Sequence, residues 1–373
     1  MSQNSPPSSK RSVIRTEGMI DPHVHLRDWN QAGKETLRHG LSVAFRAGLD
    51  AVFEMPNTDP PLLTRDLIRR RIDDADAACQ NLGIRIFHGL YAGLTAVPRQ
   101  IEEAVRTWKD LFPRVVGLKM YAGHSTGQMG VVDPGEQALV YRTLAALGFT
   151  GVLAVHCEKE ELLRPAEWDP SRPVSHVRAR PPAAEVASVN DQKALAGKAR
   201  FRGTLHVCHI STPWALDLLR GRHEETASPD APQLRLTCGL TPHHALLDAN
   251  MMESAEGLLL KVNPPLRPLP MPGLMLQRLV DGDIDWIETD HAPHTRRDKM
   301  EGFASGFPGL AFYPKFVGLL AQRGLAPARI RELSHDAVCR IFGMEIPAAG
   351  RKPETGLEKE YEFDAWAVRR SAP

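Results

Sequence analysis

The chain has 373 residues, and its 46 lysines and arginines against 45 acidic residues leave a formal charge of +1. This balance argues against a nucleic-acid-binding protein, and no apolar run approaches the ~18 residues that span a bilayer, which excludes a membrane protein. Five scattered cysteines without CxxC spacing argue against a disulfide framework or a thiolate metal cluster, and they favour a reducing, cytoplasmic setting.

The predicted elements begin after a tail over residues 1–16. This segment is rich in Ser, Pro and Lys, has no apolar stretch for a signal peptide and cannot bury enough surface to fold. Its composition is also typical of an organelle transit peptide, but the amphipathic pattern of such peptides is missing. We therefore expect a disordered tail.

Eight short runs rich in Val, Ile, Leu and Phe follow, and most end in Gly, Pro, Asn or His. They span residues 18–26, 49–57, 84–92, 115–123, 151–159, 204–212, 234–242 and 284–292. Helical patterns lie between them, as at 34–48, 67–83 and 101–112, and several close with glycine. Strand and helix alternating eight times predict one α/β domain, a (β/α)₈ TIM-type barrel.

An open, doubly wound sheet is the alternative architecture. The first predicted strand lacks a GxGxxG turn and the chain has no Walker-type loop, so the barrel is favoured. Two Pro-rich intervals, 161–185 and 250–273, predict long βα-loops over the barrel mouth, where such loops carry function.

Metal-ligand residue types gather at the ends of the predicted strands. His23 and His25 close the first strand, His156 the fifth, His209 the sixth and Asp290 the eighth. Because the C-terminal ends of all barrel strands meet on one face, we expect these side chains to share one mouth. Imidazole and carboxylate donors suit Zn²⁺ or a similar divalent ion.

The alternation of side chains along a strand predicts which residues near these candidate ligands face the barrel mouth. His206 and His209 differ by three positions, so on an extended strand only one of them faces the mouth. We choose His209 and expect His206 to be a hydrogen-bonded structural histidine. The same alternation predicts that Cys157 and Cys208 point outward, towards the helices.

Lys119 lies near the end of the fourth predicted strand. An ammonium group beside divalent cations is repelled unless the amine is neutral or converted into an anion. Taken alone, Lys119 is better interpreted as a barrel lysine that extends its charge to solvent.

The chain resembles the dihydroorotase family of the amidohydrolase superfamily, in motifs that keep the family order and span nearly the whole chain. They are DPHVHLRD (21–28), EMPNT (54–58), GLKMYAG (117–123), VHCE (155–158), HVCHIST (206–212), TPHH (241–244), KVNPPLR (261–267), TDHAPHT (289–295) and GFPGL (306–310). The resemblance implies a reversible hydrolysis of the cyclic amide of (S)-dihydroorotate to N-carbamoyl-L-aspartate in pyrimidine (UMP) biosynthesis. The alternatives are a hydantoinase-like or allantoinase-like hydrolase, or a non-catalytic partner of a transcarbamoylase.

The resemblance also implies two divalent ions, most simply Zn²⁺. By it, His23 and His25 bind one ion, and His156 and His209 bind the other. Asp290 binds the first ion. It also acts as the catalytic base for a hydroxide held between the two metals, and as the catalytic acid for the leaving nitrogen.

By the same resemblance, CO₂ converts Lys119 into a carbamate that bridges the two ions. Such a group is an anionic ligand, which removes the repulsion between an ammonium group and the metals. Ser125 and Thr126, in the Gly-rich loop that follows, suit a lid over the substrate or, alternatively, a flexible surface turn.

Arg27 stands two residues beyond His25, on the same side of the strand, and can bind a substrate carboxylate through two parallel hydrogen bonds. Hydantoinase-like members have no such need, because their substrates lack that carboxylate. The resemblance implies further substrate contacts from Asn57, Asn263, His294, Pro308 and Gly309. His243 and His244 match the family pattern without a role that we can assign.

Few residues precede the first predicted strand, so we expect little or no accessory β-sandwich, which many relatives have. Residues 17–345 are expected to form the metal-dependent hydrolase barrel. Residues 346–373 are expected to form a C-terminal extension packed on it, with one strand around 360–368. A homodimer is the default assembly, and a transcarbamoylase is the candidate protein partner.

Overall fold

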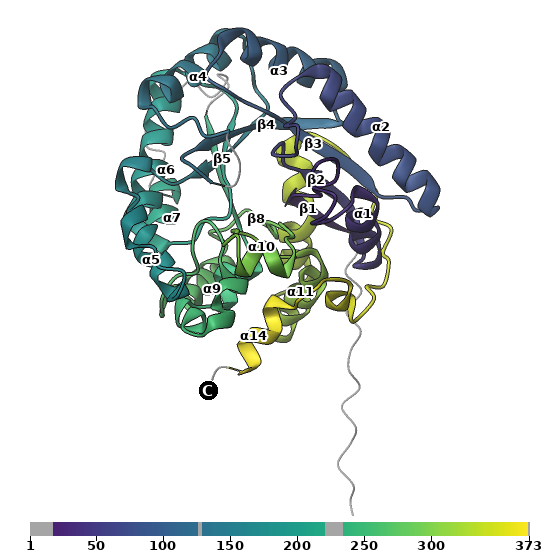
Figure 1. Ribbon diagram of the computed structural model, residues 1–373. Coiled ribbons are helices and arrows are strands. Elements are labelled where there is room, and N and C mark those ends of the chain that lie inside the picture. Colours follow the sequence, from purple (N-terminus) through teal and green to yellow (C-terminus); the bar gives the residue numbers. More distant parts are fainter. Residues whose placement is uncertain (1–17, 126–128, 221–233, 372–373) are drawn as a thin grey trace, which may run out of the picture.

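The computed structural model describes residues 18–125, 129–220 and 234–371. Eight parallel strands follow one another in chain order, each hydrogen-bonded to the next. They are β1 (Met19–Val24), β2 (Leu49–Glu54), β3 (Phe87–Gly93), β4 (Val115–Ala122), β5 (Val152–Cys157), β6 (Thr204–Val207), β7 (Arg235–Leu240) and β8 (Trp286–Ile287). The N–H of His25 donates to the carbonyl of His291 at 2.7 Å, which joins the first strand to the segment after the last. The predicted barrel is confirmed (Figure 1).

Helices form an outer ring around these strands (Figure 1). The ring contains α1 (Leu37–Arg46), α2 (Arg65–Leu82), α3 (Pro98–Leu111), α4 (Pro134–Ala146), α6 (Pro182–Lys198), α7 (Pro213–Arg220), α9 (Met271–Asp281) and α11 (Tyr313–Gln322). Shorter helices are α5 (His176–Ala179), α8 (Pro242–Leu246), α10 (Arg296–Met300), α12 (Pro327–Arg331), α13 (Ala337–Phe342) and α14 (Ala365–Ser371). None of the helices in the described part of the chain is long and apolar enough to cross a membrane.

Local sequence explains where these helices begin and end, as α2 illustrates. The Thr64 side chain accepts the N–H of Leu67, which satisfies one of the unpaired donors at the helix start. Gly83 ends the helix with a φ of 65°, a left-handed conformation that glycine adopts without a steric penalty. The glycine stop predicted at this position is confirmed.

The barrel interior is filled with aromatic side chains at the end where the strands begin. The Phe342 ring of α13 lies 5.0 Å from Phe53 and 5.9 Å from Trp286, measured between ring centroids. Gly18, just before β1, packs against His335 in the π-helical turn that precedes α13. Aromatic side chains thus fill this end of the barrel, and the polar side chains of the cavity lie at the other end of the strands.

The two Pro-rich intervals form long loops after β5 and β7, as predicted. They contain short 3₁₀ turns: η1 (Glu160–Leu162), η2 (Pro165–Glu167), η3 (Pro173–Ser175), η4 (Ala249–Met252) and η5 (Ala255–Leu260). Within the described ranges the barrel strands form the one sheet of the molecule, and an accessory β-sandwich is absent there.

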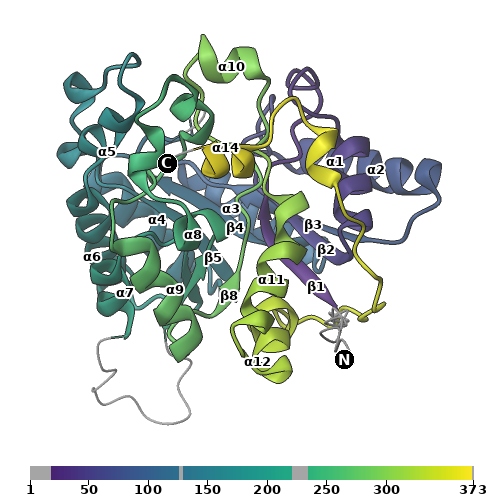
Figure 2. The same cartoon turned by 90° about the horizontal axis from the view of Figure 1, so that it is seen from below.

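The strand predicted around 360–368 is wrong. A 3₁₀ turn (η8, Leu357–Glu360) and α14 occupy this segment. Trp366 of α14 instead stacks on Phe312, with ring centroids 3.5 Å apart and planes 6° from parallel. α14 lies at the same end of the barrel as α10, and α12 lies at the other end (Figure 2). The tail predicted over 1–16 lies outside the described residues.

Candidate active site

A polar cavity opens at the C-terminal ends of the strands. Predicted site residues that line it are His23, His25, Arg27, Asn57, Ser125, His156, His209, Asn263 and Asp290. Tyr121, Ser305 and Gly306 complete much of the wall. The cavity therefore unites side chains from seven of the eight strands or from the loops that follow them, as a parallel barrel requires.

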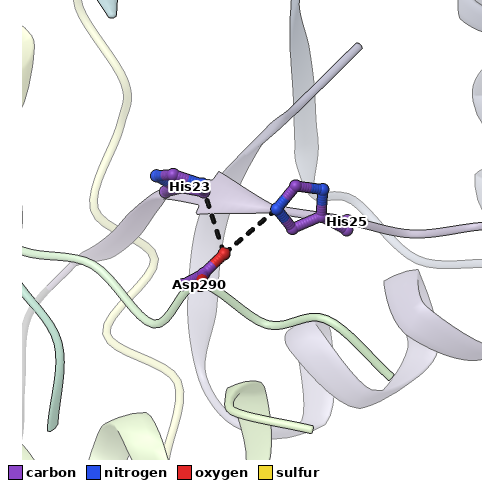
Figure 3. A group of neighbouring side chains, drawn as sticks. All are labelled: His23, His25 and Asp290. Carbon is purple, nitrogen blue, oxygen red and sulfur yellow. Dashed lines mark hydrogen bonds and ion pairs between the residues drawn. The ribbon is translucent and has the colours of Figure 1, made fainter. Parts of the chain in front are cut away.

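His23, His25 and Asp290 converge on one point of this cavity (Figure 3). Asp290 Oδ1 lies 3.3 Å from His23 Nε2 and 3.0 Å from His25 Nε2, and all three side chains are buried. Burial lowers the pKa of His25 to about 4, against the opposing effect of Asp290, so this imidazole is neutral at pH 7. Burial would raise the pKa of Asp290, but hydrogen bonding to His25 and the charge of His23 hold it below its usual value.

His156 and His209 form the second part of the site. Glu158 Oε2 lies 3.1 Å from His156 Nε2, and because a carboxylate only accepts, this nitrogen carries the proton. The lone pair on His156 Nδ1 therefore faces His209 Nε2, 3.2 Å away. Arg180 holds Glu158 at 2.6 Å and thereby fixes the tautomer of His156.

The donor set fits a divalent cation. Ligand atoms of His23, His25 and Asp290 all lie within 4.8 Å of one another. Burial lowers the pKa values of His156 and His209, so both offer the neutral imidazole that metals require. These residues could hold a metal ion, as the sequence predicts.

Three site residues adopt left-handed backbone conformations that side chains other than glycine rarely take. The φ angles are 55° at Arg27, 37° at His209 and 49° at Asp290. Each residue stands where its strand has ended, and the reversed φ turns its side chain into the mouth. Such local strain is typical of functional sites.

The side-chain directions that strand alternation predicts for β6 are wrong in part. Cys208 does not point outward: its Sγ accepts a hydrogen bond from Lys119 Nζ at 3.0 Å inside the barrel. His206 also faces the interior, where it stacks on Trp286 at 4.3 Å. The positive φ of His209 breaks the alternation, so His209 enters the mouth although its neighbour is also internal. Strand periodicity alone could not predict this turn.

His206 is a hydrogen-bonded structural histidine, as predicted, and its partner is a residue that the sequence analysis missed. Glu288 Oε2 lies 3.0 Å from His206 Nε2 and accepts the Trp286 indole N–H at 2.9 Å. Glu288 Oε1 accepts the backbone N–H of His209 at 2.5 Å and lies 3.5 Å from His23 Nδ1. This carboxylate thus orients two predicted ligands at once. Its position two residues before Asp290, on the same side of the strand, could have identified it.

Gly239 on β7 provides the space that Glu288 occupies, since a Cβ at this position would overlap the Glu288 carboxyl group. We expect Gly239→Ala to lower the free energy of unfolding by about 2–4 kcal/mol, because displacing a buried carboxylate leaves its donors unpaired. Chemical denaturation measures the change. Gly197→Ala in α6 is the matched control, because a Cβ there meets nothing within 4 Å. Equal stability of both variants would contradict this account of Gly239.

Lys119 is completely buried on β4, so it does not extend its charge to solvent. Its Nζ lies over the Tyr121 ring at 4.9 Å and donates to Cys208. No carboxylate of the described residues forms an ion pair with it. Burial would raise the pKa of the Cys208 thiol, but the charges of Lys119 and His23 lower it to about 5, so this thiol is the acidic neighbour of the lysine.

Arg27 lines the same cavity. Its Nε donates to the carbonyl of Pro293 at 3.2 Å and its Nη2 lies 3.2 Å from His294 Nε2, whereas Nη1 has no hydrogen-bond partner among the described residues. The carbonyl of Arg27 accepts from Arg71 Nη2 at 3.0 Å, and Arg71 is itself paired with Glu54. This buried pair, which the sequence analysis also missed, supports the left-handed turn at Arg27.

The predicted amide contacts lie on two walls of the cavity. Asn57 Oδ1 is 2.5 Å from His25 Nδ1, so Asn57 also orients a predicted ligand. Asn263 Oδ1 accepts from Ser305 Oγ at 3.1 Å and lies 2.9 Å from His176 Nε2.

Three further predicted residues lie behind or away from the wall. His294 is buried behind it, with Nε2 3.1 Å from the carbonyl of Ser305. Gly309 uses its N–H to donate to His291 Nδ1 at 3.0 Å, and Pro308 lines a separate hollow beside Trp366. Thr126 lies outside the described residues.

His243 and His244 differ in their surroundings. His244 is held by Thr241 Oγ1 at 2.9 Å and the carbonyl of Pro264 at 3.0 Å. His243 is buried against Phe307, and neither of its ring nitrogens has a hydrogen-bond partner among the described residues. His244 thus acts as a structural link between β7 and the loop after it.

Comparison with known proteins identifies the family, although no family model matches the chain. The chain is 31% identical to the dihydroorotase of Thermococcus kodakarensis over 336 residues, which cover 90% of this chain and 70% of that protein. It is 32% identical to the dihydroorotase of Pyrobaculum aerophilum, over 88% of this chain and 73% of that protein.

Solved structures show the same fold. The L-hydantoinase (dihydropyrimidinase) of Arthrobacter aurescens matches with a TM-score of 0.74 and 23% identity, over 91% of this chain and 73% of that one. The dihydroorotase of Campylobacter jejuni matches with a TM-score of 0.66 and 18% identity, over 88% and 84%. The sequence relatives and the shared barrel together show that this chain belongs to the dihydroorotase family of the amidohydrolase superfamily.

Proposed function

We propose that this protein is a dihydroorotase that reversibly hydrolyses the cyclic amide of (S)-dihydroorotate to N-carbamoyl-L-aspartate. The observation that carries the proposal is the buried Arg27, which lines the same cavity as the His and Asp cluster. Its unpartnered Nη1 suits the carboxylate that distinguishes dihydroorotate from uncharged cyclic amides. Family membership supports the same activity.

Two divalent ions, most simply Zn²⁺, would be held by the predicted ligand set. Its members are His23, His25, His156, His209, Asp290 and a CO₂-derived carbamate on Lys119. When bound, such ions lower the pKa of a water molecule to about 7 and polarise a carbonyl group. The burial of Lys119 on β4, where no carboxylate of the described residues pairs with it, supports its conversion into an anionic ligand.

The residues of the chain divide the remaining work. Arg27 binds the substrate carboxylate, while Asn57 and Asn263 hold the ring through their amide groups. Asp290 accepts the proton of the attacking water and returns it to the ring nitrogen that leaves. Its pKa, held below the usual value by hydrogen bonding to His25 and the charge of His23, keeps this carboxylate ionised.

The test is the ultraviolet absorbance change when dihydroorotate is added to metal-replete protein, run beside hydantoin and allantoin. We expect selective turnover of dihydroorotate, with about two metal ions per chain by elemental analysis. Faster turnover of hydantoin or allantoin would assign the site to another cyclic amide. Absence of any turnover at full metal occupancy would overturn the enzymatic proposal in favour of a non-catalytic partner of a transcarbamoylase.

Arg27→Ala is expected to lower kcat/KM for dihydroorotate by about a hundredfold or more, because the substrate carboxylate loses a desolvated, charged partner. Steady-state kinetics on dihydroorotate measures this change. Arg38→Ala, at an exposed arginine of α1, is the control and should leave kcat/KM unchanged. Normal kcat/KM in Arg27→Ala would remove the carboxylate assignment.

The activity would serve pyrimidine biosynthesis, in the cytoplasm. A homodimer and an association with a transcarbamoylase are proposed as the quaternary context. Size-exclusion chromatography with light scattering tests the first, and co-purification with the transcarbamoylase of the same organism tests the second.

A further inference from the structure

Buried positive charges in this protein fall into two groups. The described residues bury six arginines and lysines: Arg27, Arg71, Lys119, Lys261, Arg267 and Lys299. Arg71 is paired with Glu54, and Arg267 faces Glu185 at 3.9 Å. In the described ranges the other four form no ion pair with a carboxylate. The carbamate proposal accounts for Lys119, and the proposed carboxylate contact accounts for Arg27, which leaves Lys261 and Lys299 unexplained.

Lys299 and Lys261 contact neutral acceptors. Lys299 Nζ donates to the carbonyls of Lys261 at 2.7 Å and Gly306 at 2.8 Å. Lys261 Nζ donates to the carbonyl of Phe303 and to Ser305 Oγ, each at 2.8 Å. The Trp168 ring also lies 5.2 Å from Lys261 Nζ. These neutral groups satisfy the donors, but no carboxylate of the described residues pairs with either ammonium group, which is unfavourable in a buried environment.

Both ammonium groups lie directly behind the cavity wall. Gly306 and Ser305, their hydrogen-bond partners, line the cavity. The carbonyl of Ser305 also lies 3.1 Å from His294, which contacts Arg27. Each lysine is therefore hydrogen-bonded to a residue that lines the cavity, on the side where His294 contacts Arg27.

We propose that Lys261 and Lys299 are specificity-determining residues whose buried charges select a substrate that carries a carboxylate at the Arg27 end of the cavity. This inference rests on the proposed function and extends it to residues that do not touch the substrate. A carboxylate in the cavity supplies the negative charge that the two lysines lack.

Electrostatics supports this assignment. Burial lowers the pKa of Lys261 to about 8 and holds that of Lys299 well below its usual value. Burial also lowers the pKa of His294, and the charges of Arg27 and Lys299 lower it further. A bound carboxylate opposes the shifts at both lysines, because a nearby opposite charge favours the charged form.

The experiment compares two ligands in two variants, Lys299→Met and Lys261→Gln. The glutamine removes the charge and retains an N–H donor for the carbonyl of Phe303, on a side chain one bond shorter. The ligands are dihydroorotate, as substrate, and dihydrouracil, the same ring without the carboxylate, as inhibitor. We expect KM for dihydroorotate to rise about tenfold in each variant, with kcat within about threefold and Ki for dihydrouracil unchanged.

Lys193→Met is the matched control, because Lys193 Nζ also donates to a backbone carbonyl, that of Leu218, away from the cavity. A parallel rise of KM and Ki in the lysine variants would show a merely structural link between the loops and overturn the proposal, as would an unchanged KM. If wild type and Lys193→Met do not turn over dihydroorotate, the proposed function fails separately. Calorimetric binding of dihydroorotate and dihydrouracil to the same proteins then decides whether the lysines select an anion.

Discussion

Asp290→Asn is expected to lower kcat for dihydroorotate about a thousandfold or more, which is the scale of a lost general acid and base. Asparagine has the same shape and keeps an oxygen near His23 and His25, so the fold and the ring positions should persist. It cannot, however, accept the proton of the attacking water or return it to the leaving nitrogen. Initial rates from the absorbance assay, with elemental analysis of the same sample, measure the loss.

The control for this substitution is Asp285→Asn, at the start of the same strand. Asp285 pairs with Arg220 at 2.6 Å and lies at the opposite end of the barrel from the cavity. This variant should keep wild-type kcat, although its free energy of unfolding falls by up to about 1 kcal/mol. If Asp290→Asn retains kcat within about tenfold of wild type, Asp290 is not the acid and base.

Lys119→Met should be inactive, with a loss of about a thousandfold or more, and should bind less metal than the wild type. Methionine fills the buried space beside Tyr121 and Cys208, so the melting temperature should change little. The side chain can no longer carry a carbamate, which the two proposed metal ions need as an anionic ligand. Kinetics and elemental analysis of the purified variant test both expectations.

Lys119→Arg separates the carbamate from the positive charge. Arginine keeps a cation at the same position but is not expected to form the carbamate, so it should be as inactive as Lys119→Met. Incubation of the wild type with ¹³C-bicarbonate should give a carbamate carbon signal in NMR that both variants lack. Activity of Lys119→Arg within about tenfold of wild type would contradict the carbamate assignment.

The sequence by itself determined the number of strands, their order and the end of the barrel that carries the site. Hydrophobic runs that stop at Gly, Pro or His show where strands end, and a parallel barrel necessarily brings those ends together. Asp290 could therefore be grouped with His23 and His25, although more than 260 positions of the chain separate it from them. The glycine stop at Gly83 is likewise a local property of the backbone.

Only the tertiary structure decided how individual side chains point and what compensates their charges. The positive φ of His209 overrides strand alternation, and α14 forms where the local pattern suggests a strand, with its Trp366 stacked on Phe312. Glu288 orients two predicted ligands, and no carboxylate of the described residues pairs with Lys261 or Lys299, because contacts between distant segments set these environments. Short-range sequence patterns describe the periodicity of one element, whereas counter-ions and backbone strain depend on every element that packs around a residue.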